Sequence, residues 1–389
     1  MKHNPQLDAL RALAALAIIA FHYLLFPAGW IGVQFFFVLS GFLISGIILK
    51  GKKQYAHTGM TAFFKDFYKR RVLRLFPLYY GYVLILGISY LFLKKPEALN
   101  IEWPWLLTYT LNFRWLFNGY TFHMVYGHLW SLSLEWQFYL VWPLFLWLLP
   151  KKSATMVFCW LIPLAMVIRI LAYVICNHIQ YLVGFNGNAK AEALAPYVLP
   201  FSHLDAFVLG ALLCNEKVRK VLSKPLWVYS SMALTVTAGL LLVITIPAYS
   251  LASLGWPSNL PSAYQWIWGY SLLNFTSATI IAAIIERKNA SLFSFTRLRL
   301  LQYLGKISYG IYVYHPLLVF AMFAIRDKVS PFPGKSLLEL LLIMILTSIV
   351  AHFSYHLWEK HFIKKKKIKT AITKPLPEPE VESEILYTN

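Results

Sequence analysis

A histidine and an arginine lie on one face of the first long apolar segment. His22 follows Arg11 by eleven residues within the run from Leu7 to Trp30. Eleven helical steps make three turns plus about 20°, so both polar groups point the same way, roughly 16 Å apart. Ionisable groups are costly in a membrane, and imidazole titrates near neutral pH. The pair predicts a polar track through the membrane, with His22 as a general base. The alternative is that Arg11 reaches the interface and His22 is a hydrogen-bonded packing residue.

A basic cluster precedes the third apolar segment. Arg71 and Arg74 are three residues apart, so they are neighbours on one helix face. Planar guanidinium groups bind phosphate in bidentate fashion, which predicts a phosphate clamp. The alternative is that these arginines only set the membrane topology, but Arg74 lies a turn inside the apolar run.

A third polar group lies around an acidic residue at the start of the fourth apolar segment. Glu135 lies in the string from His128 to Tyr139, with Ser131 and Gln137 near it. Such a patch is too polar for lipid contact, so it should face a cavity or pair with a cation. We expect Glu135 to orient the protonated His22 or to hold a substrate hydroxyl. A hydrogen-bond network between helices is the alternative.

Arg169 is the strongest remaining polar candidate, because it lies in the outer half of a span where no basic topology signal is needed. We expect Arg169, Ser131 and Gln137 either to stabilise a reaction's oxyanion or to bind the substrate that accepts the transferred group. Structural pairing explains most of the other intramembrane polar residues, which are His203, Asp205, Lys306, His315, His356 and Glu359. The sequence has no HExxH string, no clustered metal ligands and no Gly-rich nucleotide loop, so it predicts no metal and no bound cofactor.

The composition is that of a polytopic membrane protein. The chain has 389 residues, of which 59% are hydrophobic and 13% are charged. A soluble domain averages about 25% charged residues. Segments able to cross about 30 Å of hydrocarbon fall at 7–29, 31–49, 72–93, 129–149, 154–175, 198–214, 226–246, 266–285, 303–325 and 337–357. This predicts an all-α bundle of about ten transmembrane helices, of which the sixth is the shortest.

The net charge of +20 comes mainly from short connections between spans, which argues against nucleic-acid binding. Under the positive-inside rule, the distribution of Lys and Arg predicts that both termini are cytoplasmic. Thr58–Arg71 is expected to form an amphipathic surface helix. The predicted domains are a transmembrane domain at 1–363, which carries the candidate site residues, and a disordered cytoplasmic tail at 364–389, first basic and then acidic and Pro-rich.

Seven strings, in order along nearly the whole chain, resemble those of acyltransferase family 3, membrane enzymes that acylate surface glycans and some secondary metabolites. The strings are LDALRALAALAIIAFHY at 7–23, GVQFFFVLSGFLIS at 32–45, FYKRRVLRLFPLYY at 67–80, LWSLSLEWQFYLVWPL at 129–144, HLDAFVLGALL at 203–213, YLGKISYGIYVYHPLL at 303–318 and SYHLWEKHF at 354–362. Each is moderately specific alone, and the resemblance rests on all seven together.

The resemblance implies roles for the matching residues. His22 would be the essential histidine and Arg11 its partner, Arg71 and Arg74 would handle the acyl-CoA donor, and Glu135 would be the acidic residue of the fourth span. Three positions depart from the family's pattern. Gln34 replaces a frequent acidic residue, Trp136 a second glutamate, and His203 an arginine. A mechanism that needs paired carboxylates is therefore in doubt.

The resemblance predicts transfer of an acyl group from acyl-CoA to a hydroxyl of a cell-surface or exported glycan, with acetyl-CoA as the expected donor. The expected location is the bacterial plasma (inner) membrane. Direct transfer and a covalent acyl-histidine both remain open. The expected partners are the lipid bilayer, acyl-CoA and a glycan or lipid-linked saccharide, without nucleic acid. The alternatives are acylation of a small metabolite such as a macrolide, and proton-coupled transport of a glycolipid or acyl carrier. Inverted repeats, typical of transporters, are not apparent.

Overall fold

The computed structural model describes residues 4–92, 100–117, 123–150, 153–183, 194–287, 291–329 and 336–363. Its regular elements in these ranges are helices, and seven of them are long and apolar enough to cross a membrane. The chain is therefore an all-α integral membrane protein. The count of ten spans and the cytoplasmic orientation of both termini stay predictions. The predicted tail at 364–389 lies outside the described residues.

A helix occupies the place of each predicted span. These helices are α1 (Pro5–His22), α2 (Ile31–Gln54), α3 (Gly59–Phe92), α7 (Leu129–Leu148), α8 (Ala154–Val183), α10 (Leu204–Leu212), α12 (Pro225–Thr245), α13 (Gln265–Glu286), α15 (Ser308–Val329) and α16 (Leu337–Ser354). Shorter elements between and after them are η1 (Pro27–Trp30), α5 (Trp103–Leu107), α6 (Leu111–Arg114), α9 (Leu194–Val198), η3 (Pro200–His203), α11 (Glu216–Leu222), η4 (Leu251–Ser253), η5 (Ser291–Arg297), α14 (Arg299–Lys306) and the π-helix η6 (Tyr355–Glu359).

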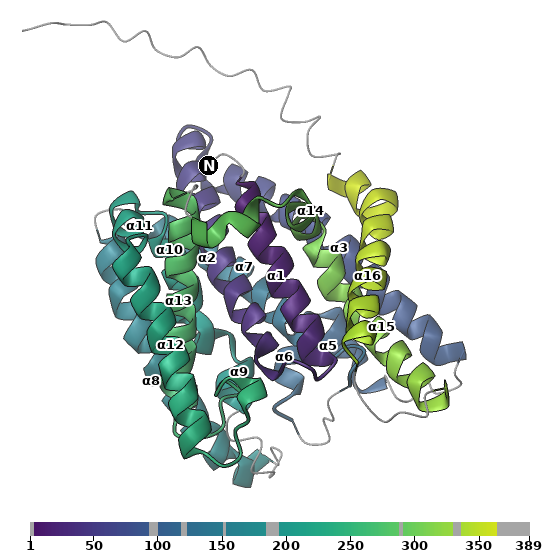
Figure 1. Ribbon diagram of the computed structural model, residues 1–389. Coiled ribbons are helices and arrows are strands. Elements are labelled where there is room, and N and C mark those ends of the chain that lie inside the picture. The colour runs from purple at the N-terminus through teal and green to yellow at the C-terminus, as the bar shows by residue number, and fades with distance from the viewer. Residues whose placement is uncertain are drawn as a thin grey trace, which may run out of the picture.

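The bundle has a buried centre and an apolar outer surface. Helices α1 and α2 lie in the middle, with α8 and α12 on one side and α15 and α16 on the other (Figure 1). In the most apolar stretch of α2, 67% of the residues are buried, whereas the corresponding share is 22% in each of α8, α12 and α16. Because the exposed faces of these outer helices carry Leu, Ile, Val and Trp, they suit contact with lipid tails.

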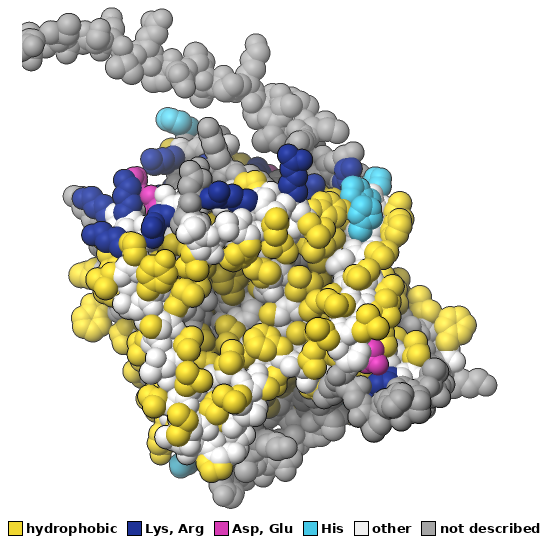
Figure 2. Space-filling model, viewed as in Figure 1, with side chains coloured by type: hydrophobic (Ala, Val, Ile, Leu, Met, Phe, Trp, Pro, Cys, Tyr) yellow, Lys and Arg dark blue, Asp and Glu magenta, His cyan; other side chains and the backbone are white. Residues whose placement is uncertain are grey.

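Charge is concentrated at one end of the bundle. Helix α1 begins and α16 ends at this end, uppermost in Figure 1, and we call it the basic end. Figure 2 shows Lys and Arg side chains gathered along it, above a broad band of hydrophobic side chains. Lys53 of α2, Lys69 of α3 and Lys220 of α11 are exposed basic residues. This separation supports the prediction that the basic end faces the cytoplasm.

Four predicted segments have different limits in the structure. Helix α1 ends at His22 rather than at residue 29, because Leu24 adopts a left-handed conformation (φ 61°) and Pro27 starts η1. The predicted surface helix at 58–71 is continuous with the third span as α3. The predicted segment 303–325 is divided into α14 and α15. Helix α10 has nine residues, too few to cross the hydrocarbon alone.

Close approach of α2 and α10 depends on two glycines. A Cβ on Gly41 would lie 2.2 Å from the Phe207 carbonyl oxygen, and one on Gly210 would lie 2.0 Å from that of Val38. Gly41 and Gly210 therefore allow the close packing of these two helices, since only hydrogen fits between their backbones.

We expect Gly41→Ala to lower the free energy of unfolding by about 1–3 kcal/mol, because the backbones of α2 and α10 must separate. Thermal unfolding of the purified protein in detergent measures the effect. Gly81→Ala is the matched control, because a Cβ there would meet nothing within 4 Å. Equal melting temperatures for the two variants would contradict this account of the contact.

Candidate active site

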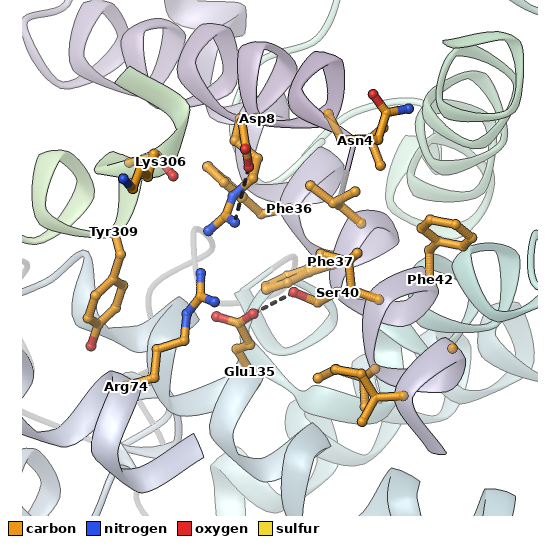
Figure 3. A pocket seen from close by; sticks show the side chains of 18 of the residues that line it. Asn4, Asp8, Phe36, Phe37, Ser40, Phe42, Arg74, Glu135, Lys306 and Tyr309 are labelled. Carbon is orange, nitrogen blue, oxygen red and sulfur yellow. Dashed lines mark hydrogen bonds and ion pairs between the residues drawn. The ribbon is translucent and has the colours of Figure 1, made fainter. Parts of the chain in front are cut away.

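A cavity of about 1010 Å³ reaches from the basic end into the bundle. It lies among α1, α2, α3, α7 and α15, and Figure 3 shows side chains from these helices around it. Ten charged side chains line it, namely Asp8, Arg11, Lys50, Arg71, Arg74, Glu135, Arg219, Glu286, Lys306 and Glu359. Six are cationic and four are anionic, so the cavity is suited to a large polar ligand with negative groups.

Arg11 enters the cavity from the first turns of α1. Its guanidinium nitrogen lies 4.0 Å from the carboxylate of Asp8, one turn earlier on the same helix. Gly305 of α14 packs directly on this turn, because a Cβ there would lie 1.7 Å from the Asp8 carbonyl oxygen. The close contact brings Lys306, the next residue, to the cavity wall. The sequence favours structural pairing for Lys306, whereas in the structure this residue lines the cavity.

Helix α3 places two arginines in the cavity. Arg71 lies against two aromatic rings, 5.5 Å from the centre of Phe67 and 5.6 Å from that of Tyr139. Arg74, one turn later, reaches the same space as Glu135 (Figure 3). Both arginines also line a second, adjoining cavity of about 310 Å³. They therefore stand where the two cavities meet, which is a suitable place for phosphate groups.

Arg70 has a different role from its neighbour. Its guanidinium forms an ion pair with Asp66, one turn earlier on α3. This bond leaves Arg70 at the edge of the second cavity, outside the larger one. Of these three arginines, Arg71 and Arg74 thus line the larger cavity, whereas Arg70 pairs with Asp66.

Glu135 is held in the cavity wall by two hydroxyl donors. Ser40 Oγ donates to its Oε1 at 2.5 Å, and the Tyr139 hydroxyl donates to the same oxygen. Four residues earlier on α7, Ser131 Oγ lies 2.5 Å from the hydroxyl of Tyr312 on α15. Ser131 and Tyr312 both line the cavity, and they close part of its inner wall. Tyr312 was not singled out from the sequence.

Three histidines meet just beyond Ser131 and Tyr312. His22 Nδ1 lies 3.1 Å from His315 Nε2, and the ring centres are 4.8 Å apart. The ring of His128 lies 5.3 Å from that of His315. The Tyr312 hydroxyl donates to the carbonyl oxygen of His128 at 3.0 Å, which connects this cluster to the cavity wall. His22 itself is partly exposed and does not line the cavity.

Arg169 lies in a separate buried cluster. Its side chain is fully buried, and Nη2 forms an ion pair with Asp205 of α10 at 2.6 Å. The same guanidinium donates to the carbonyl oxygens of Ser202 and Ile267 and to Ser271 Oγ. The structure thus does not bring Arg169 to the cavity.

Gln137 also points away from the cavity. Its amide exchanges hydrogen bonds with the amide of Asn112 and donates to the carbonyl oxygen of Tyr109. The structure therefore brings Arg11, Arg71, Arg74, Glu135 and Ser131 together around the cavity. His22 lies outside the cavity and is connected to its wall through His315 and Tyr312, and Gln137 and Arg169 lie elsewhere. The roles predicted for these two residues in oxyanion stabilisation or acceptor binding find no support in their positions.

The chain matches known proteins along most of its length. Residues 4–356 match the family model Acyl_transf_3, described as an acyltransferase domain. The "Putative peptidoglycan O-acetyltransferase YrhL" of Bacillus subtilis is 27% identical over 377 residues, which cover 92% of this chain and 55% of that protein. The "Peptidoglycan O-acetyltransferase OatA" of Listeria monocytogenes is 35% identical over 155 residues, covering 37% of this chain and 24% of the relative.

The "Putative O-acetyltransferase SAS0844" of Staphylococcus aureus is 26% identical over 401 residues, which cover 96% of this chain and 59% of that protein. The chain thus spans somewhat more than half the length of the relatives that match it throughout. No solved structure gives a significant match.

Proposed function

Because the chain belongs to acyltransferase family 3, we propose that it is a membrane O-acyltransferase that moves acetyl from acetyl-CoA to a hydroxyl of a cell-surface glycan. One observation carries the proposal. A cavity lined by Arg11, Arg71 and Arg74 extends from the basic end to Ser131 and Tyr312, and Tyr312 is connected to His22 through His315. A polyanionic donor from the cytoplasm would thereby meet a general base within the membrane.

The cationic part of the cavity suits the phosphates of CoA. We propose that Arg71 and Arg74 hold these phosphates, since both arginines stand where the two cavities meet. Arg11, in the first turns of α1, adds a third guanidinium to the wall along which the pantetheine arm would pass toward Ser131 and Tyr312. Glu135 is held by Ser40 and Tyr139, and its negative charge balances the surrounding arginines when no donor is bound.

The chemistry requires one base and a bound thioester. We propose that His22 takes the proton of the acceptor hydroxyl as its oxygen attacks the thioester carbonyl. The carbon–sulfur bond then breaks, and the departing CoA sulfur receives that proton, so the products are an O-acetyl ester and CoA thiol. His22 is partly exposed at the end of α1 remote from the basic end. An acceptor would thus approach from the outer side while the donor enters from the cytoplasmic side.

The acceptor class follows from the relatives. Two of them carry names as peptidoglycan O-acetyltransferases, so we propose a glycan hydroxyl as the acceptor. The bacterial plasma membrane is the location at which cytoplasmic acetyl-CoA and an external glycan are both accessible. Acetyl transfer from [¹⁴C]acetyl-CoA to peptidoglycan fragments by the purified protein in lipid tests this proposal. Radioactivity that stays on CoA under all conditions would refute it.

Arg74→Gln is expected to raise the KM for acetyl-CoA about 10- to 100-fold, with a smaller change in kcat. A charge-assisted hydrogen bond contributes about 1.5–3 kcal/mol, and the lost contact binds a part of the donor that does not react. Steady-state kinetics over a range of acetyl-CoA concentrations measure the effect. Lys69→Gln is the matched control, because Lys69 is exposed on the same helix and lines neither cavity. An equal KM in the two variants would exclude this donor site.

A further inference from the structure

The position of His315 depends on the proline that follows it. Pro316 lies inside α15 and has no N–H, so it cannot donate to the carbonyl oxygen of Tyr312 four residues earlier. His315 Nδ1 lies 2.7 Å from that oxygen and occupies the vacant hydrogen-bond position. Because a carbonyl only accepts, the proton of the neutral His315 ring is on Nδ1, and Nε2 carries a lone pair.

A backbone carbonyl also determines which ring nitrogen of His22 carries the proton. Its Nδ1 lies 3.0 Å from the carbonyl oxygen of Ile18, which requires an N–H at this nitrogen. His315 Nε2 lies 3.1 Å from the same Nδ1. The lone pair on His315 Nε2 can therefore share the His22 proton with Ile18. A neutral His22 ring in this tautomer carries its remaining lone pair on Nε2.

We propose that His315 is a positioning residue that holds His22 in the Nδ1–H tautomer and thereby presents His22 Nε2 as the base. The inference rests on the proposed function of the site. When His22 Nε2 accepts the proton of the acceptor hydroxyl, the ring becomes an imidazolium with an N–H at both nitrogens. His315 Nε2 then accepts a hydrogen bond from the cationic ring, which strengthens as the charge develops.

Tyr312 links this pair to the donor cavity. Its carbonyl oxygen anchors His315, and its phenol ring lines the cavity, with the hydroxyl 2.5 Å from Ser131 Oγ. His315 is fully buried, so its orientation is set by Tyr312 and His22 rather than by solvent. One residue on α15 thus fixes both the inner wall of the cavity and the histidine that touches the base.

Two amide substitutions separate positioning from packing. His315→Asn places an amide near the former Nδ1, so it keeps the bond to the Tyr312 carbonyl and loses the acceptor for His22. His315→Gln places its amide oxygen near the former Nε2, so it keeps an acceptor for His22 and loses the bond to Tyr312. We expect His315→Asn to lower kcat about 10- to 100-fold, which is part of the ~10²–10⁴-fold that a positioned base supplies. His315→Gln should recover most of this loss.

The kinetic constants of these two variants can support or overturn the proposal. In His315→Asn the KM for acetyl-CoA should stay within about twofold, because the interaction affects the transition state and not donor binding. A better kcat for Asn than for Gln, or an equal loss in both with a raised KM, would overturn the proposal, because packing or the Tyr312 bond would then matter more than the acceptor.

A spectroscopic measurement does not depend on turnover. Nitrogen-15 NMR of histidine-labelled protein in lipid, with His22 assigned by its absence from His22→Asn, reports which ring nitrogen is protonated. We expect a protonated Nδ1 and an unprotonated Nε2, with the Nδ1 resonance shifted in His315→Asn. A proton on Nε2 would overturn the inference whatever the enzyme's activity. An inactive wild-type protein with the expected spectrum would refute the proposed function and leave the positioning contact established.

Discussion

His22→Asn is expected to lower kcat for acetyl transfer by about 10²- to 10⁴-fold, the contribution of a positioned general base. Asparagine reproduces the Nδ1–H of the ring, so its amide can still donate to Ile18 and His315. It has no group at the position of Nε2, so the acceptor hydroxyl loses its base. The KM for acetyl-CoA should change little, because His22 does not line the donor cavity.

The His22 measurement needs a folding control. Size-exclusion profiles and melting temperatures of His22→Asn should match those of the wild-type protein, because the hydrogen bonds at Nδ1 are kept. Lys69→Gln gives the background of an exposed substitution. A kcat within a factor of about three of wild type, in a folded variant, would remove His22 from the mechanism.

The second large effect concerns stability. Asp205→Leu should lower the free energy of unfolding by about 3–5 kcal/mol, because it leaves the fully buried guanidinium of Arg169 without its counter-charge. The double variant Arg169→Leu/Asp205→Leu should recover much of this loss, since neither charge then remains buried. Unfolding in detergent by heat or by a graded denaturant measures both values.

This comparison also decides what Arg169 does. If Arg169 has only a structural role, the double variant, once folded, should transfer acetyl at a rate close to that of the wild-type protein. A stable double variant whose kcat falls by the ~10²-fold or more expected for a lost oxyanion donor would instead restore the catalytic role predicted from the sequence. Activity of the purified, folded fraction distinguishes the two.

The sequence was sufficient to predict the helices and several residues of the cavity. Apolar runs of about twenty residues identify membrane helices, because the backbone must satisfy its own hydrogen bonds in lipid. Helical spacing also placed Arg71 and Arg74 on one face of α3. The sequence did not show that α1, α3 and α7 converge, since packing between helices depends on contacts far apart in the chain, such as Gly305 on Asp8.

Contacts between side chains on different helices are harder to predict from the sequence. Arg169 and Asp205 lie on α8 and α10, and no local pattern indicates that they form an ion pair. The unusual position of Arg169 in the outer half of a span suggested function, whereas the structure shows a buried partner. Conversely, the sequence favours structural pairing for His315, for which we propose a positioning role. The signal that could have identified it is the His315–Pro316 dipeptide, since proline frees a carbonyl that the histidine can use.

Two departures from the family's pattern explain each other in the structure. Gln34 stands where an acidic residue is frequent, and His203 where an arginine is frequent. The two side chains contact one another, with Gln34 Nε2 3.2 Å from His203 Nδ1. His203 Nε2 lies 2.7 Å from the carbonyl oxygen of Tyr197, so its proton is on Nε2 and Nδ1 accepts from Gln34. A neutral hydrogen-bonded pair therefore occupies this site, and both residues are fully buried.

The central claim is that acetyl passes from a donor at the basic end, past His22, to an acceptor on the opposite side. Proteoliposomes whose protein exposes the basic end outward, with [¹⁴C]acetyl-CoA outside and peptidoglycan fragments enclosed, test it most directly. We predict that label accumulates on the enclosed fragments with the wild-type protein, and that His22→Asn reduces this accumulation about 10²-fold or more. Equal labelling by the two proteins, or label that remains on external CoA with the wild type, would contradict the account.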